Sequence, residues 1–332
     1  VHVDAIELLA QKRALELFGL SADEWSVNVQ SLSGSPANLA VYAALVPQGG
    51  KIMGLSLDHG GHLTHGHKAS MTGKWWQQVP YEVDKETEVL DHTAIRDIAM
   101  REKPAMIVAG YTAYSRIIDW DAFRAIAEES GALLHVDASH IAGLIAGGVY
   151  PSPFPFADTV VMTTHKTLRG PRGALIFSRK ALSAKIDKAV FPGLQGGPHM
   201  NTIAGIAVAL HEAAQASFGE YAAHVVENAQ AFAQALADKG WRIISGGTDT
   251  HVFLVDTWLH GVAGKAASDA LEKEGIIVNK NAIPFDTRTP VDPSGIRIGT
   301  AAETTRGKTP EDMRALAERI DSILRGLEGN DN

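Results

Sequence analysis

The chain has 332 residues, of which 45% are apolar and 20% charged, and it contains no cysteine. This composition is typical of a globular protein with room for one large domain and a smaller one, and it excludes disulfides and thiolate metal sites. The formal net charge of −8 gives no basic surface for a nucleic acid. We expect a cytoplasmic protein, because no apolar run is long enough to cross a bilayer and the first residues do not resemble a signal peptide.

Strands and helices alternate through the first two thirds of the chain, which predicts an α/β fold. We expect helices near residues 4–18, 39–46, 92–102, 119–130, 200–217 and 219–238. We expect strands near residues 25–30, 51–57, 105–109, 132–136, 158–162 and 173–178. The later pattern predicts strands near 241–245, 251–256 and 276–279, and helices near 264–274 and 309–326. We therefore divide the chain into a large domain, 1–215, and a small C-terminal α+β domain, 216–332.

The turn Ser33-Gly34-Ser35 joins the first expected strand to a helix. Its small residues would let a phosphate approach the backbone, and the helix would supply free N–H groups and the positive end of its dipole. The same residues, followed by Pro36, also suit an ordinary helix N-cap. Both interpretations stay open, and the N-cap is the more common one.

Four histidines fall within the glycine-rich loop from His59 to His67. Zinc sites usually place their ligands on defined elements and often include a carboxylate or thiolate, whereas this loop offers only Asp58 nearby. We therefore predict no metal site in this loop.

Two charged residues lie at or within apolar strands. Asp137 follows the strand at 132–136, where its carboxylate could either bond a protonated ring nitrogen or cap the turn that begins at Ser139. Arg297 lies in the alternating segment 294–300, where its guanidinium needs a partner. That partner would be either a buried carboxylate of the chain or the carboxylate of a substrate.

Lys166 follows the apolar strand at 158–162. A surface lysine beside Arg169 and Arg172 is the ordinary interpretation of such a residue. An amine this close to buried sequence is costly unless it is used or neutralised, which makes Lys166 a candidate nucleophile.

The segment around Lys166 resembles the cofactor-lysine segment of the serine hydroxymethyltransferases. Thr-Thr-His-Lys-Thr-Leu, followed by Gly-Pro-Arg-Gly, matches nearly residue for residue, and the resemblance runs from Val1 to about Ile323. It implies a fold-type I enzyme that uses pyridoxal 5'-phosphate (PLP), with a mostly parallel seven-stranded sheet flanked by helices. The implied reaction is the reversible conversion of L-serine and tetrahydrofolate to glycine and 5,10-methylenetetrahydrofolate through a PLP aldimine.

The resemblance also implies a role for each candidate residue: Lys166 would bind PLP as an imine, Asp137 would hold the ring nitrogen, and His62 would stack on the ring. The implied catalytic set is Lys166, His62, Asp137, His140, Thr163 and His165. The implied PLP-binding set is Ser33, Gly34, Ser35, His62, Thr112, Asp137, His140, Lys166, Arg172, Gly196 and Gly197. The implied substrate set is Arg297 for the carboxylate, with Leu57, Gly61, Leu63 and Asn281 for the folate side.

The family further implies a homodimer, or a dimer of dimers, in which the Gly196-Gly197 turn reaches the phosphate held by the partner chain. Its N-terminal arm contributes a glutamate and tyrosines and would precede Val1, so we expect this chain to be a processed or truncated form. Two alternatives stay open. One is a folate-independent aldolase or transaldolase acting on β-hydroxy amino acids, and the other is a non-catalytic PLP-binding protein.

Overall fold

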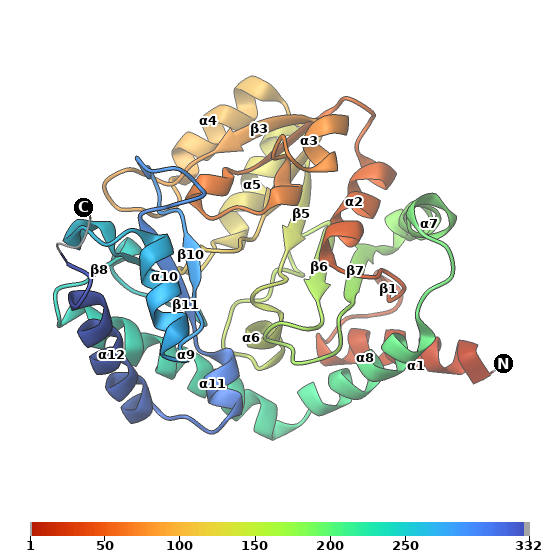
Figure 1. Ribbon diagram of the computed structural model, residues 1–332. Coiled ribbons are helices and arrows are strands. Elements are labelled where there is room, and N and C mark those ends of the chain that lie inside the picture. Colours follow the sequence, from red (N-terminus) through yellow and green to blue (C-terminus); the bar gives the residue numbers. More distant parts are fainter. Residues whose placement is uncertain (1, 329–332) are drawn as a thin grey trace.

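The computed structural model of the chain describes residues 2–328, and its larger part is built on a seven-stranded sheet (Figure 1). The strand order is β1-β7-β6-β5-β4-β2-β3. The strands are β1 (Trp25–Asn28), β2 (Lys51–Leu55), β3 (Gln77–Tyr81), β4 (Met106–Ala109), β5 (Leu133–Asp137), β6 (Thr159–Thr163) and β7 (Ala174–Arg179). Only β7 runs against the others in this sheet. The expected mostly parallel seven-stranded sheet is confirmed.

Helices cover both faces of this sheet because its strands are apolar on both sides. Neighbouring residues of one strand point to opposite faces. Val108 therefore packs in the cluster that contains α2 and α7, whereas Ile107 packs in the cluster that contains α1, α4, α5 and α8. The helices of this part are α1 (His2–Leu17), α2 (Gly34–Leu45), α3 (Met71–Trp75), α4 (His92–Glu102), α5 (Trp120–Ser130), α6 (Ala142–Ala146), α7 (Ser183–Lys188) and α8 (Met200–Ala213).

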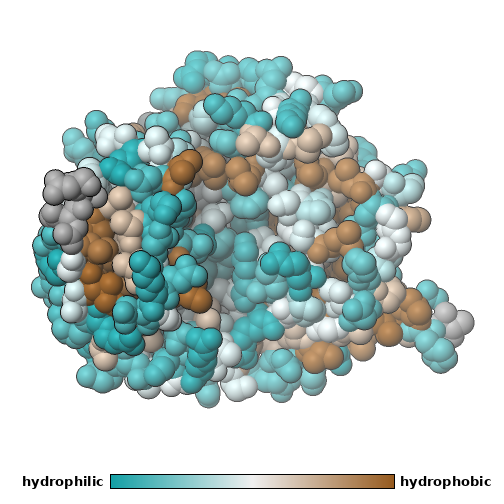
Figure 2. All heavy atoms as spheres, in the orientation of Figure 1, coloured by the Kyte–Doolittle hydropathy of each residue, from teal (hydrophilic) through white to brown (hydrophobic). Residues whose placement is uncertain are grey.

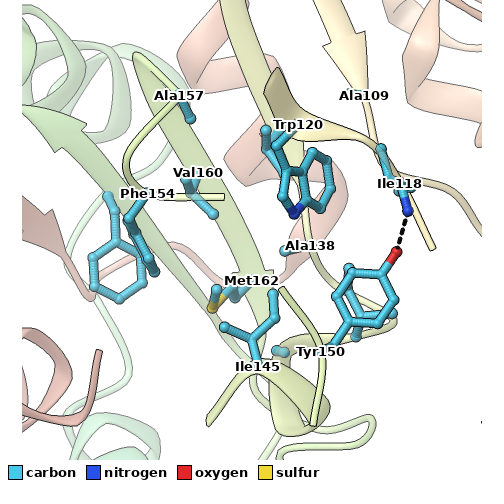
Figure 3. Packing of buried hydrophobic residues seen from close by; sticks show 14 of the residues in the cluster. Ala109, Ile118, Trp120, Ala138, Ile145, Tyr150, Phe154, Ala157, Val160 and Met162 are labelled. Carbon is cyan, nitrogen blue, oxygen red and sulfur yellow. Dashed lines mark hydrogen bonds between the residues drawn. The ribbon is translucent and has the colours of Figure 1, made fainter. Parts of the chain in front are cut away.

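Buried aromatic residues hold the connection between β4 and α5 in place (Figure 3). Trp120, at the start of α5, packs in the same cluster as Phe154 and Met162. The backbone N–H of Ile118 donates to the Tyr150 hydroxyl at 2.9 Å, so the polar end of this buried ring has a partner. This connection also carries Thr112, so the packing fixes one wall of the site described below.

The smaller part contains a four-stranded antiparallel sheet with the order β10-β11-β9-β8. Its strands are β8 (Arg242–Ile243), β9 (Val252–Asp256), β10 (Asn279–Asn281) and β11 (Gly295–Gly299). The helices here are α9 (Ala216–Ala237), α10 (Gly264–Lys273), α11 (Ala301–Thr305) and α12 (Pro310–Arg325). This sheet packs on α10 and α12 through a second apolar core, which confirms the small α+β unit.

Helix α9 contributes to both cores. Phe218 and Val225 in its first half belong to the core of the large sheet, and Phe232 and Leu236 in its second half belong to the small core. The division at residue 215 therefore stays a prediction. Figure 2 shows this face of the molecule hollowed between the small part on the left and the large sheet on the right.

One expected strand is wrong. Of residues 276–279, only Asn279 belongs to a strand, because the N–H of Ile276 bonds the carbonyl of Leu271 and closes the end of α10. Strand β3 was not expected from the sequence, because it is an edge strand whose Pro80 weakens the strand pattern. None of the described helices is both long and apolar enough to cross a membrane.

Candidate active site

The carboxyl ends of the parallel strands meet at one edge of the large sheet, which is where α/β folds bind ligands. Strand β5 ends at Asp137, and β6 ends at Thr163 shortly before Lys166. A cavity of about 290 Å³ opens at this edge. Its lining residues are Ser33, Gly34, Ser35, His62, Tyr111, Thr112, Asp137, Ser139, His140, Thr163, His165, Lys166 and Arg172.

The N-terminus of α2 forms one wall of this cavity. Ser33 occupies the N-cap position, but its side chain makes no capping hydrogen bond, so the first N–H groups of the helix lack the usual side-chain acceptor. A Cβ on Gly34 would lie 2.6 Å from Cγ2 of Thr163, so only glycine fits here without a shift. The turn is thus an N-cap by position, and it leaves donors free for an anion.

Lys166 is half-buried and also lines the cavity. Burial is the main cause that lowers the pKa of its amine, and the positive charges of Arg297 and Arg172 act in the same direction, whereas Asp137 opposes them. A larger fraction of this amine is therefore uncharged than for an exposed lysine, which is the form that acts as a nucleophile.

Asp137 is buried at the end of β5 and accepts three hydrogen bonds. Its Oδ2 accepts from Nδ2 of Asn38 at 2.8 Å and is 3.1 Å from Nε2 of His65, and its Oδ1 accepts from the N–H of Ser139 at 3.1 Å. Burial alone would raise the pKa of Asp137, but the bond and charge of His65, with His62 and Ser139, bring it well below its usual value. The bond from Ser139 is the expected turn cap, and the same carboxylate lines the cavity.

His62 lies between η1 (Leu57–His59) and η2 (Leu63–His65), short helical turns that follow β2. Its Nδ1 accepts the N–H of Thr64 at 3.2 Å and is 2.7 Å from the Thr64 hydroxyl. Burial is the main cause that lowers the pKa of His62 to about 4, and the neighbouring His65 acts in the same direction. The imidazole is therefore neutral near pH 7 and presents an aromatic ring to the cavity.

Two further histidines at the cavity have unpartnered polar atoms. Nδ1 of His140 and Nδ1 of His165 are buried without a hydrogen-bond partner. His140 stacks on His251 with the ring centroids 5.6 Å apart, and burial is the main cause that lowers the pKa of each. Buried polar atoms without partners are uncommon in folded proteins, and here they mark where a ligand could bind.

Arg297 lies on β11 next to the cavity, so the small sheet also contributes to the site. Its guanidinium donates to the carbonyl of Thr112 at 3.1 Å and to Oδ1 of Asn279 at 3.0 Å. Within residues 2–328 no carboxylate pairs with it. The buried salt bridge considered from the sequence is thus absent from the described part of the chain, and the charge is available to an anion.

Some predicted residues lie outside the cavity lining. Gly61 is buried where a Cβ would meet the carbonyl oxygen of Leu55 at 2.0 Å, so close packing alone explains its glycine. Leu63 is 45% exposed, and the side chain of Asn281 donates to the neighbouring carbonyl of Ala282. Leu57 is half-buried in η1.

The turn at Gly196 and Gly197 also lies apart from the cavity of its own chain. Both glycines are exposed, and a Cβ on either would meet no atom of the chain within 4 Å. Backbone amides in such an open turn are accessible to another chain.

Two residues that line the cavity, Tyr111 and Ser139, were not expected there from the sequence. Ser139 ties the ends of β5 and β6 together, because its hydroxyl accepts the N–H of Thr163 at 3.2 Å. Also not expected at the site were Asn38, His65 and His135, which lie behind Asp137. A histidine inside the apolar strand β5 and an asparagine inside the apolar helix α2 were the available signals.

His62, His65 and Asp137 have ligand atoms within 4.8 Å of one another, so they could in principle hold a metal ion. Asp137 already accepts a bond from His65 and another from Asn38. A metal ion would have to displace these bonds, so we interpret the cluster as a hydrogen-bond network.

Residues 1–320 match the family model described as serine hydroxymethyltransferase. The chain belongs to the serine hydroxymethyltransferase family. The serine hydroxymethyltransferase of Desulfotalea psychrophila is 51% identical over 326 residues, covering 98% of this chain and 76% of the relative. That of Sorangium cellulosum is 52% identical over 326 residues with the same coverage, and that of Acidothermus cellulolyticus is 51% identical over 329 residues, covering 99% and 76%. The resemblance found in the sequence is confirmed, and with it the serine hydroxymethyltransferase fold.

Proposed function

We propose that this chain reversibly converts L-serine and tetrahydrofolate to glycine and 5,10-methylenetetrahydrofolate, with PLP as its cofactor. The observation that carries the proposal is the position of Lys166, whose amine has a lowered pKa and faces the same cavity as Asp137 and the uncapped end of α2. A cytoplasmic location is part of the proposal, because the cysteine-free sequence suits a reducing compartment.

The residues of the cavity fit PLP. The free N–H groups at Ser33–Ser35 suit its phosphate, the ionised Asp137 suits a protonated ring nitrogen, and the amine of Lys166 suits its aldehyde. The unpartnered Nδ1 of His140 supports the fit, because it would gain a polar partner. When bound, PLP supplies an electron-withdrawing ring that accepts the electrons of a bond broken at the α-carbon of an amino acid.

The chain's own groups would hold and orient the reactants. Asp137 would keep a proton on the ring nitrogen, because the hydrogen bonds to its carboxylate hold it ionised. His62 would cover one face of the ring as a neutral imidazole. Thr112, His165 and Arg172 would complete the polar walls, and Thr163 would fix the strand end that precedes Lys166.

Arg297 would bind the substrate carboxylate. Its guanidinium is held by Thr112 and Asn279, and it lacks an acidic partner in the described chain, so a bidentate bond to a carboxylate would satisfy it. Fixing the carboxylate fixes the rotation about the α-carbon, which selects the bond that is broken. Leu57, Gly61, Leu63 and Asn281 would lie on the folate side.

A homodimer with shared active sites is also proposed. One helix N-terminus offers about half a positive charge to a phosphate that carries nearly two negative charges, so further amide donors should converge on it. The exposed turn at Gly196 and Gly197 has such donors and does not line the cavity of its own chain.

One series of variants tests both proposals. Lys166→Ala should abolish borohydride-trapped labelling by PLP and lower folate-dependent cleavage of serine on the order of a thousandfold, or about 4 kcal/mol of barrier. The matched control is Lys273→Ala, an exposed lysine on α10 that should leave both unchanged. Labelling that persists in Lys166→Ala would refute the assignment. Equal serine cleavage with and without tetrahydrofolate would favour the aldolase.

Mixed dimers then test whether each active site is built from residues of both chains. A Cβ at Gly196 or Gly197 would meet no atom of its own chain within 4 Å, so Gly196→Val and Gly197→Val should leave the chain folded. A dimer of one such chain with one Lys166→Ala chain should place both defects in one site and recover about half of the wild-type activity, since two equivalent sites lie across one two-fold axis. Heterodimers without any recovery would place each site within a single chain.

A further inference from the structure

A polar network lies behind Asp137, and its three other side chains do not line the cavity. It joins Asn38 on α2, His135 on β5 and Thr159 on β6, which are at most 1% exposed. They lie among apolar residues of the cluster that contains α2 and α7, and the ring of Tyr42 packs edge-on against His135. Polar side chains buried in an apolar layer destabilise a fold unless every donor and acceptor is matched.

The donors and acceptors of this network can be matched in only one way. The ionised carboxylate of Asp137 only accepts, so Asn38 must turn its Nδ2 toward Oδ2, at 2.8 Å. Oδ1 of Asn38 then faces Nε2 of His135 at 3.1 Å, so Nε2 carries the proton. Burial lowers the pKa of His135 to about 3, so this ring is neutral and its Nδ1 accepts from the Thr159 hydroxyl at 2.8 Å. Each hydrogen bond in this series, from Thr159 through His135 and Asn38, is donated in the direction of Asp137.

A second branch leaves the network at Asn38. The other hydrogen of Nδ2 goes to Oγ1 of Thr64 at 2.9 Å. With its oxygen accepting from Asn38, the Thr64 hydroxyl can donate to Nδ1 of His62 at 2.7 Å, which also accepts the backbone N–H of Thr64. The free proton of the neutral His62 ring is therefore on Nε2. The amide of Asn38 thus connects Asp137, assigned to the ring nitrogen, with His62, assigned to one face of the ring.

We propose that Asn38 is a positioning residue that orients Asp137 and His62 together toward the cofactor ring, with its own amide locked by His135 and Thr159. The inference rests on the proposed function, because Asp137 needs its orientation only if a ring nitrogen lies in front of it. Asn38 touches no reactant and does not line the cavity. It acts through the bond to Asp137 and through Thr64.

Ligand binding separates this role from a merely structural one. The probes are PLP and its 1-deaza analogue, in which carbon replaces the ring nitrogen, and the measurement is the dissociation constant of each for the apoprotein. Loss of the Asn38 bond to an ionised group should weaken PLP binding about tenfold, as expected for one charge-assisted bond. Binding of the deaza analogue should change little, because Asp137 has no protonated nitrogen to contact. The preference for PLP over the analogue should therefore fall about tenfold in Asn38→Leu.

Three further variants distinguish a positioning role of Asn38 from a general effect on the stability of the fold. Asn38→Leu alone leaves the N–H of His135 unsatisfied and should lower the melting temperature. The double variant Asn38→Leu/His135→Phe replaces both partners by apolar groups, so it should recover stability without recovering the preference for PLP. His135→Gln keeps a donor for Asn38 and should retain the preference. Asn228→Leu removes an equally buried asparagine that bonds Thr304 and the carbonyl of Lys308, and it should lower stability with the preference unchanged.

Equal weakening of PLP and the deaza analogue in Asn38→Leu would overturn the inference, as would recovery of the preference in the double variant. Wild-type protein that binds neither compound would overturn the proposed function itself, and the inference with it.

Discussion

Two hollows in the described part of the chain are comparable in size but differ in how their charges are matched. The groove beside α12 in the small part measures about 390 Å³, and the cavity at the edge of the large sheet about 290 Å³. In the groove, Arg306 pairs with Glu303, and Lys308 lies 3.4 Å from Asp312. Its most exposed apolar residue, Ile277, has 85% of its surface in solvent.

The cavity has the opposite character. Arg297 has no acidic partner in the described chain, and buried nitrogen atoms of His140 and His165 have no hydrogen-bond partner. Burial also lowers the pKa of Lys166 and of Arg297. Most charged groups of the larger hollow are therefore paired with one another, and its Arg319 donates to the carbonyl of Glu274 at 3.4 Å. The smaller hollow has buried polar groups that a ligand would match. Unmatched buried polar groups locate the site here, and volume does not.

The largest expected difference between the two hollows concerns their carboxylates. Asp137→Asn should keep part of the PLP binding but lower kcat/KM for serine on the order of a thousandfold, because a neutral amide does not hold a proton on the ring nitrogen. Asp312→Asn in the groove should leave kcat/KM unchanged. Steady-state kinetics of both variants measure this. Equal activities for Asp137→Asn and wild type would make Asp137 a turn cap only.

A smaller difference should be seen in the pH dependence of stability. Burial lowers the pKa of His135 and of His251 from 6.5 to about 3, so the unfolded chain binds more protons than the folded one between these values. Stability should therefore fall as the pH drops below about 6.5, by about 1 to 2 kcal/mol for each histidine between pH 7 and pH 5. The groove has no histidine among its lining residues.

Urea unfolding at pH 7 and pH 5 measures this effect. His135→Gln and His251→Gln should each reduce the loss of unfolding free energy between the two pH values, whereas a variant of the groove should not. Identical losses in wild type and both histidine variants would show that these rings are protonated in the folded chain.

The smallest effect is expected at the rim of the groove. Ile277→Asp should change the free energy of unfolding by less than about 0.5 kcal/mol, because the side chain is already in solvent. Thermal unfolding and the serine assay together test this. A loss of several kcal/mol would mean that the groove is covered in the protein as it exists in solution.

The sequence predicted the parts of the site that lie in one short segment. Lys166 and Asp137 follow apolar strands, and parallel strands bring their carboxyl ends to one edge, so the strand pattern alone places the two side chains near each other. The turn at Ser33 was recognisable for the same reason, because a strand and a helix flank it. The family resemblance then supplied roles for these residues that their spacing does not contain.

The rest of the site depends on contacts between distant segments. Asn38 looks like a polar interruption of an apolar helix, and only the fold brings it within hydrogen-bond distance of Asp137 and His135. Arg297 lies beside the cavity on the other sheet, so its distance from Lys166 depends on how two separate cores pack. The expected strand at 276–279 failed because apolar residues there serve the end of a helix.

Helix α9 has a mechanical consequence for the site. Its 22 residues span about 33 Å without a break and enter both cores. Near its middle, where it passes from one core to the other, the buried amide of Asn228 donates to Thr304 and to the carbonyl of Lys308. A closure that moved one core relative to the other would have to bend this helix. We therefore expect this continuous helix to limit changes in the spacing between Arg297 and Lys166.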